Sequence, residues 1–293
     1  MPKLETEIAG IKMKNPVMVA SGTFGFGKEY AEYIDLNKLG AIVTKSITLK
    51  PREGNPPPRL VETPAGMLNS IGLENPGIEG FLAEELHFLA KFDTPIIVNI
   101  AGESIEEYAE LAKILSREPT VKGLEINISC PNVKKGGMSF GMDPKLTAEV
   151  IAQVRKSALS LPIIAKLTPN VTDITVIAKA AVEAGADALS AINTILGMAI
   201  DIETGKSRLG TLTGGLSGPA IKPIALRMVY EISHTVNVPV IGIGGIVSGQ
   251  DAYEFILAGA KAVQVGTANF IDVEAPLKII KELEAYLNKD LPG

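Results

Sequence analysis

Cys130 is the only cysteine of this 293-residue chain, and it stands at the end of an apolar segment, Gly123–Cys130. An ionised thiol can act as a base or a nucleophile, whereas a buried thiol often serves only as core packing. The loop that it opens, CPNVKKGGMSFG, contains three glycines and could close over a site and open again. We interpret Cys130 as a catalytic base, with core packing as the alternative.

Two lysines and several amides and hydroxyls also stand at the ends of apolar segments. They are Ser21, Lys45, Ser46, Asn99, Asn127, Lys166, Asn193 and Thr194. Burying one such group without a partner costs about 1–3 kcal/mol, so a cluster of them indicates a polar ligand. A flavin needs a cation near its N1/O2 edge and hydrogen-bond donors for its pyrimidine ring, and lysine and asparagine supply both. A Schiff base on Lys166 or Lys45 is the alternative chemistry.

Glycines follow the last two apolar segments, in GIGG at 242–245 and VGT at 265–267. Together with Gly218 they predict backbone N–H groups that bind a phosphate, to which Thr267 can add its hydroxyl. Val247 occupies the place of the third glycine in a dinucleotide fingerprint, so the run does not match that motif. The same glycines could instead serve only to allow tight turns.

Composition argues against several other classes of protein. The net charge of −5 disfavours nucleic-acid binding. No apolar run is long enough to span a membrane, and the N-terminus lacks the apolar core of a signal peptide, so we expect a cytoplasmic protein. The two histidines, His87 and His234, fall in helical segments, and we therefore expect no metal site and no histidine base.

A repeating pattern of strand and helix must position these groups. Eight apolar, β-rich segments recur: Pro16–Ala20, Ala41–Ser46, Pro95–Ala101, Gly123–Cys130, Pro162–Leu167, Ala188–Thr194, Pro239–Gly245 and Ala262–Thr267. Most are almost continuously apolar, as parallel strands buried on both faces are. Amphipathic helices are predicted at Ser104–Ser116, Pro144–Leu159, Ile174–Ala184, Ile221–Thr235 and Gln250–Ala258. Eight repeats favour an α/β fold of one (β/α)8 TIM barrel domain over residues 1–293.

Four further segments complete the expected architecture. Leu4–Lys14 predicts a small hairpin that turns at Ala9-Gly10 and could close the bottom of the barrel. The connections Ile47–Pro76, Pro131–Asp143 and Ile195–Ser217 are long, and each follows a strand. They are therefore expected at the C-terminal face, where barrel enzymes carry their active sites.

The string INISCPNVKKGG resembles the active-site loop of class 1 dihydroorotate dehydrogenases, in which cysteine replaces the serine of the membrane-associated class 2 enzymes. Other blocks are similar to the family in the same order: NPVMVASGTFG, TKSITLKPREGNPPPR, GMLNSIGLENPG, VNIAGES, AKLTPNVTDI, INT, GGLSGPAIKP, IGIGGI and VQVGTANF. They span residues 15 to 270. The resemblance implies an FMN-dependent flavoprotein that oxidises (S)-dihydroorotate to orotate in pyrimidine biosynthesis.

The resemblance also implies residues for each ligand. FMN would be bound by Ser21, Lys45, Ser46, Asn99, Asn127, Lys166 and Ile192, with its phosphate on Gly218, Gly244, Gly245, Gly266 and Thr267. The substrate would be bound by Lys45, Asn69, Ser70, Ile71, Gly72, Leu73, Asn127, Asn132, Asn193 and Thr194. Cys130 would remove a proton from C5 of dihydroorotate while hydride passes from C6 to flavin N5, and Lys166 would stabilise the reduced flavin.

Two stretches, SGTFGFGKEYAEYIDLNKLGAIVTKS and CPNVKKGGMSFG, resemble the branch of class 1 that passes electrons to NAD. In that branch a partner subunit carries FAD and an iron–sulfur cluster, and the resemblance implies a heterotetramer of two catalytic and two electron-transfer chains. A single cysteine cannot hold such a cluster, so it is expected on the partner. The alternatives are the fumarate-reducing homodimer of class 1A, another FMN barrel reductase acting on pyrimidines, and a non-catalytic module that binds a phosphate-bearing ligand.

Overall fold

Eight parallel strands close a barrel, which confirms the predicted fold. The computed structural model describes residues 4–129, 131–132, 138–158 and 160–288. The barrel strands are β3 (Val17–Val19), β4 (Ala41–Val43), β7 (Ile96–Ile100), β8 (Val121–Asn127), β11 (Ile163–Leu167), β12 (Ala188–Ala191), β15 (Val240–Ile243) and β16 (Ala262–Val265). They are hydrogen-bonded in this order, and β16 pairs with β3 to complete the circle. Most strands end before the predicted segment does, so the polar residues that follow belong to loops above the barrel.

The interior of the barrel is filled in layers, because every second side chain of a strand points inward. The lower layer is apolar and fully buried, and it includes Met18, Ile97, Ile164, Ala188, Ile241 and Ala262. Two residues further along four of these strands, the inward positions are polar and also buried: Asn99, Lys166, Ser190 and Gln264. Glu125 of β8, which pairs with Asn99 of β7, adds a fifth buried polar group. A polar layer inside the barrel thus lies directly under its C-terminal end.

A hairpin covers the lower end, as the sequence predicts. Its strands β1 (Thr6–Ile8) and β2 (Ile11–Met13) are antiparallel, and Ala9 and Gly10 turn with φ of 50° and 87°. A two-residue turn with positive φ at both positions matches the twist of a hairpin. Ile8 belongs to the same buried cluster as the lower layer of the barrel, so the hairpin seals that end against water.

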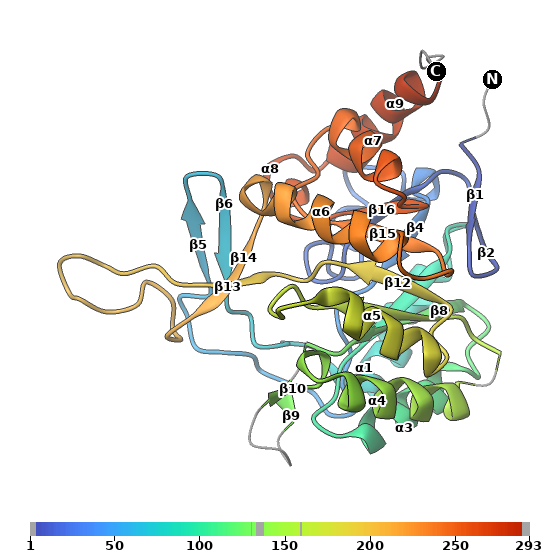
Figure 1. Ribbon diagram of the computed structural model, residues 1–293, viewed down its shortest axis with the longest axis horizontal. Helices are drawn as coiled ribbons and strands as arrows, with labels where there is room; N and C mark the ends of the chain where they lie inside the picture. Colours follow the sequence, from blue (N-terminus) through green and yellow to red (C-terminus); the bar gives the residue numbers. More distant parts are fainter. Residues whose placement is uncertain (1–3, 130, 133–137, 159, 289–293) are drawn as a thin grey trace.

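Helices surround the barrel (Figure 1). Those predicted from the sequence are α3 (Ile105–Leu115), α4 (Pro144–Ser157), α5 (Ile174–Glu183), α6 (Lys222–Ser233) and α7 (Gly249–Leu257). The chain also forms α1 (Gly77–Gly80), a π-helical turn (Phe81–Glu85), α2 (Leu86–Leu89), α8 (Ala268–Ile271) and α9 (Ala275–Leu287). Side-chain caps start several of them; Ser104, for example, accepts a hydrogen bond from the Glu107 N–H at the start of α3. Among the described residues, no helix is long and apolar enough to cross a membrane.

Two of the three long connections form a second sheet. Strands β5 (Leu60–Thr63) and β6 (Gly66–Asn69) come from the first connection, and β13 (Ile195–Gly197) and β14 (Gly214–Ser217) come from the last. They pair antiparallel in the order β13-β14-β6-β5. In Figure 1 this sheet projects from the side of the barrel opposite the β1–β2 hairpin. The remaining connection, Pro131–Asp143, forms the short antiparallel pair β9 (Pro131–Asn132) and β10 (Met138–Ser139) and a 3-10 turn (Phe140–Met142) among its described residues.

Candidate active site

A cavity of about 590 Å³ opens above the polar layer of the barrel. Its wall combines residues at the C-terminal ends of seven barrel strands with residues of β6 and β14 from the second sheet. This is the face on which barrel enzymes build their active sites from the loops that follow the strands. The second sheet therefore has a clear structural role, because it walls one side of this cavity.

Most residues that the sequence analysis assigned to FMN or substrate line the cavity. They are Ser21, Lys45, Ser46, Asn69, Ser70, Ile71, Gly72, Leu73, Asn127, Lys166, Ile192, Asn193, Thr194, Gly218, Gly244, Gly245, Gly266 and Thr267. Asn99 does not line it, because its side chain is fully buried in the polar layer below. Cys130 and the side chain of Asn132 lie outside the described residues. The geometry brings the two predicted sets together, and the ligand role of each residue stays a prediction.

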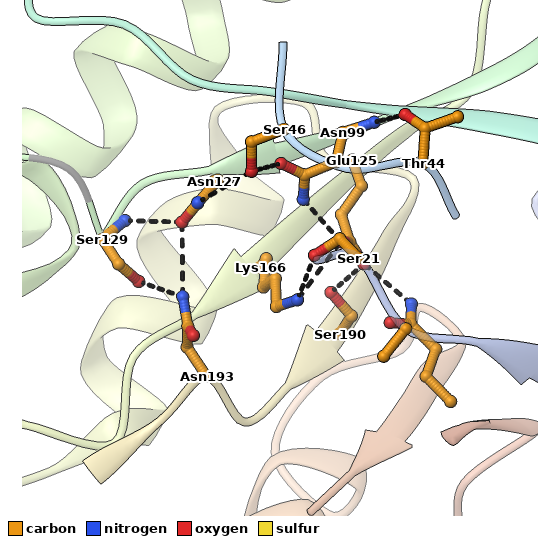
Figure 2. Close-up of polar contacts among 12 residues, drawn as sticks. Ser21, Thr44, Ser46, Asn99, Glu125, Asn127, Ser129, Lys166, Ser190 and Asn193 are labelled. Carbon is orange, nitrogen blue, oxygen red and sulfur yellow. Dashed lines mark hydrogen bonds and ion pairs between the residues drawn. The ribbon is translucent and has the colours of Figure 1, made fainter. Parts of the chain in front are cut away.

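Lys166 lies at the floor of the cavity beside a buried carboxylate (Figure 2). Its Nζ donates a hydrogen bond to Ser21 Oγ at 2.8 Å and lies 3.4 Å from Glu125 Oε1. Glu125 is completely buried and Lys166 is 5% exposed. A buried charge is costly unless a hydrogen-bonded opposite charge accompanies it. Glu125 thus accounts for the presence of an ammonium group at the floor of the cavity.

A chain of hydrogen bonds runs from Glu125 to the cavity wall (Figure 2). Asn99 Nδ2 donates to Glu125 Oε1 at 2.7 Å, and Ser46 Oγ donates to Asn99 Oδ1 at 2.5 Å. Asn127 Nδ2 donates to Ser46 Oγ at 3.5 Å, while Asn127 Oδ1 accepts from Asn193 Nδ2 at 3.3 Å. Each bond determines which end of the next amide can donate. The chain therefore orients the two asparagines, Asn127 and Asn193, that face the cavity.

A second cation, Lys45, lies in the cavity wall within reach of a carboxylate. Lys45 Nζ is 3.7 Å from Glu74 Oε2, and the same oxygen accepts from Arg59 Nη1 at 3.0 Å. The side chains of Lys45 and Glu74 are 24% and 49% exposed, so solvent reaches this pair. Both residues line the cavity next to the segment Asn69–Leu73. An anionic ligand that bound to Lys45 would therefore compete with Glu74.

Glycines line the part of the cavity that lies at the ends of β14, β15 and β16. Gly218 and Gly245 have φ of 92° and 70°, which a residue with a side chain rarely adopts. A Cβ atom on Gly266 would meet no protein atom closer than Ala20 Cβ, at 3.7 Å. Thr267 Oγ1 donates to Ser217 Oγ at 2.8 Å beside them. Bare backbone and hydroxyl groups of this kind make a donor set suited to phosphate.

Asp251 of α7 holds the loop that follows β15. Its carboxylate accepts hydrogen bonds from Val247 N at 3.0 Å, Ser248 Oγ at 2.8 Å and Lys222 Nζ at 2.6 Å. Burial disfavours the charged form of Asp251, but the hydrogen bonds from Lys222, Val247 and Ser248 outweigh burial and hold its pKa below the ordinary value. Asp251 therefore stays ionised at neutral pH and fixes the loop beside the glycines.

Two acidic residues of this region, Glu125 and Glu74, were not predicted from the sequence. Glu125 stands inside strand β8, two residues before Asn127, and the period of two along a strand puts both side chains on the inner face of the barrel. This period of two is the feature of the sequence from which Glu125 could have been predicted to face the inside of the barrel. Glu74 follows the segment Asn69–Leu73 in the chain and lines the cavity, but nothing in its sequence surroundings distinguishes it from a surface glutamate. Within the described part of the chain, no group of three or more His, Cys, Asp or Glu side chains could hold a metal ion.

Fold and site together define a (β/α)8 barrel with a cavity at its C-terminal face, which is lined by glycines and by a lysine that is ion-paired with a buried glutamate. Comparison with known proteins then assigns the family. A family model described as dihydroorotate dehydrogenase matches residues 3–287, and the chain belongs to this family.

Individual relatives are similar over nearly their whole length. A protein of Geotalea daltonii is 60% identical over 289 residues, which cover 99% of this chain and 94% of the relative. A protein of Thermoanaerobacter pseudethanolicus is 58% identical over 284 residues, which cover 97% of this chain and 93% of the relative. Both are named dihydroorotate dehydrogenase B (NAD(+)), catalytic subunit.

Proposed function

We propose that this chain is the catalytic subunit of an NAD-linked dihydroorotate dehydrogenase, which oxidises (S)-dihydroorotate to orotate in pyrimidine synthesis and holds one FMN. The observation that carries the proposal is the Lys166–Glu125 pair at the floor of a cavity whose other side is lined by glycines. Membership of the dihydroorotate dehydrogenase family supports the reaction. The names of the relatives support NAD⁺ as the final acceptor.

The residues present fit FMN. The cavity of about 590 Å³ is large enough for a bound cofactor and substrate together. Gly266 leaves open space where a Cβ would otherwise stand, and Gly218, Gly244, Gly245 and Thr267, which line the same cavity, would hold the phosphate with it. Ser21, Ser46, Asn127, Lys166 and Ile192 would hold the ring system, with Asn99 supporting Ser46 from below. FMN, when bound, supplies the acceptor for the hydride that leaves C6 of dihydroorotate.

The chain's own residues would bind and orient the substrate and move one proton. Lys45, with Asn69–Leu73, Asn132 and Thr194, would hold the carboxylate and ring amides of dihydroorotate. Asn127 and Asn193 each offer donor and acceptor atoms, which a planar ring amide requires. Cys130 would take the proton from C5 of the substrate, and a positioned base of this kind contributes about 10²–10⁴-fold to the rate. Lys166 would place its positive charge where negative charge develops.

A partner subunit completes the proposed enzyme. The relatives are named catalytic subunits, and a catalytic subunit implies a second chain for electron transfer. We place FAD and the iron–sulfur cluster on that chain, since the single cysteine here cannot hold a cluster. The expected assembly is a heterotetramer of two catalytic and two electron-transfer chains in the cytoplasm.

The test is anaerobic reduction followed by reoxidation. Purified chain loaded with FMN is mixed with dihydroorotate, and the flavin absorbance should bleach as orotate forms. Co-expression with the proposed electron-transfer subunit should then allow NAD⁺ to restore the absorbance repeatedly. A protein that binds FMN but is not bleached by dihydroorotate would disprove the proposed reaction. Reoxidation by fumarate instead of NAD⁺ would disprove the proposed acceptor.

A further inference from the structure

The carboxylate of Glu125 lies at the centre of the polar layer and is bonded to four other barrel strands. Asn99 of β7 and Lys166 of β11 approach its Oε1 at 2.7 Å and 3.4 Å. Ser190 of β12 and Gln264 of β16 donate to its Oε2 at 2.9 Å and 2.7 Å. No exposed surface of Glu125 remains. The proposed reaction assigns no role to Glu125, so its four partners call for another explanation.

The hydrogen bonds to Glu125 suit a carboxylate. The amides of Asn99 and Gln264 and the ammonium group of Lys166 all direct hydrogens toward its oxygens, and the Ser190 hydroxyl also donates to it. Lys166 is the charged member of the four. Glu125 and Lys166 therefore form a buried ion pair, with the neutral partners satisfying the remaining lone pairs as such a pair requires.

The two charges of this pair lie at different depths. Lys166 lines the cavity, whereas Glu125 is fully buried and is not part of the wall. A ligand in the cavity thus meets the positive charge first and the negative charge behind it. Because Coulomb energy falls with distance, the nearer charge dominates and the farther one weakens it. Figure 2 shows the contacts of Lys166 with Glu125 and Ser21.

We propose that Glu125 is a positioning residue of the flavin site: it holds the Lys166 ammonium group at the cavity floor, partly offsets its charge, and thereby limits how strongly the site favours reduced flavin. The inference rests on the proposed function, since it concerns FMN bound in this cavity. It assigns no contact between Glu125 and substrate or cofactor. Glu125 acts through Lys166 alone.

The variant E125Q tests this role because it removes the charge and keeps the shape. If the amide of Gln264 turns over, the new amide can donate to Gln264 Oε1, which is buried without a hydrogen-bond partner among the described residues. With the carboxylate gone, the charge of Lys166 is no longer offset. We expect the midpoint potential of bound FMN to rise at pH 7 by about 30 mV, which is a tenfold shift toward the reduced form for a two-electron couple.

The matched control is S190A, which removes one neutral hydrogen bond from the same carboxylate and retains both charges. Its potential should stay near that of the wild type, and E125D, which keeps the charge, should lie between the wild type and E125Q. A potential in E125Q that is unchanged or lower overturns the proposal. So does an equal rise in S190A, because the effect would then be structural.

A second measurement keeps the proposal testable if E125Q alone does not fold. In apo-protein carrying K166M, the carboxylate of Glu125 is left buried without its counter-charge. Adding E125Q to K166M should raise the melting temperature, and no rise would contradict the ion pair. This measurement uses no flavin and no substrate. The potential can likewise be measured with a chemical reductant, so failure of the dihydroorotate reaction in the wild type would be seen separately.

Discussion

At the scale of single residues, the two lysines of the cavity differ in how easily each can exchange its carboxylate partner, because these partners differ in burial. The Lys166–Glu125 pair is almost fully shielded from solvent, so either charge alone would be strongly unfavourable. The Lys45–Glu74 pair is partly exposed, and such pairs are worth only about 0–1 kcal/mol. Lys45 can therefore exchange its carboxylate for that of a ligand, whereas Lys166 keeps its partner throughout.

This difference predicts the effect of E74Q. Removing the Glu74 charge frees Lys45 for the substrate carboxylate, so the KM for dihydroorotate should fall about two- to fivefold, as the loss of an exposed ion pair allows. The value of kcat should not change, because the chemistry lies elsewhere in the cavity. Steady-state kinetics measure both. E53Q makes the same charge change at an exposed residue outside the cavity, and an equal fall in KM there would refute the exchange at Lys45.

Replacing Cys130 tests the proposed base. C130A should lower kcat by at least about 100-fold, the lower end of what a positioned general base contributes, while the purified protein remains yellow with FMN. Turnover with dihydroorotate and the flavin absorbance of the same sample report the two properties. C130S should also be slow near neutral pH because a hydroxyl is a weaker acid than a thiol. Near wild-type turnover in C130A would remove Cys130 from the mechanism.

The sequence could predict most residues of the cavity wall, because they stand where apolar strands end. Glu125, Ser190 and Gln264 were missed for a different reason. Each lies inside a strand, whereas the prediction of site residues used the polar residues at strand ends. It did not use the inward-facing positions along the whole strand. Glu74 could not have been predicted from its own segment, since its nearness to Lys45 arises from the pairing of distant parts of the chain.

At the scale of elements, short loops at the ends of β15 and β16 contain the glycines that line the cavity. Their conformation depends on neighbours: Asp251 of α7 holds Val247 and Ser248, and a Cβ on Gly245 would meet Gly218 O at 2.8 Å. Gly266 differs from Gly245, because the protein leaves its Cβ position open. A methyl group at Gly266 would thus extend into the cavity in which we propose that FMN binds.

The variant G266A isolates that contact. Apo-protein should unfold near the wild-type temperature, but its affinity for FMN should fall about 5- to 150-fold, since overfilling a packed site costs about 1–3 kcal/mol. Fluorescence titration of FMN into apo-protein measures the affinity. G123A adds the same methyl group at the lower end of β8, against Ile11 Cδ1, and should leave FMN affinity unchanged. Unaltered FMN affinity in G266A would mean that the phosphate binds elsewhere.

Barrel strands and most helices were predictable because a buried parallel strand and an amphipathic helix each have a distinct apolar pattern. The second sheet was not predicted. Its strands are three or four residues long and include Gly66, Gly197, Gly214 and Gly215, and exposed, glycine-rich segments of this length do not show a strand pattern. The pairing of β6 with β14 joins residues about 150 positions apart, which no local pattern can encode.

At the scale of the whole molecule, the apolar layer that stabilises the fold and the cavity proposed as the active site lie at opposite ends of the barrel. The lower end is an apolar layer closed by the β1–β2 hairpin, and the upper end is a polar layer under a cavity. In a (β/α)8 barrel the two ends tolerate change differently, because only the upper loops reach the ligands. The polar layer, with Glu125 bonded to four strands, separates the two.

This separation predicts that I8A reduces stability without altering catalysis. Ile8 is fully buried against the lower layer of the barrel, and truncating such a side chain costs about 2–5 kcal/mol of unfolding free energy. Urea unfolding measures that loss, while kcat, KM and FMN affinity should match the wild type at temperatures where the variant is folded.

E7A, on the exposed face of the same hairpin, should change the unfolding free energy by no more than about 0.5 kcal/mol. Equal stability of I8A and wild type would show that the hairpin does not seal the barrel. A loss of FMN affinity in I8A would show instead that the two ends are coupled through the polar layer.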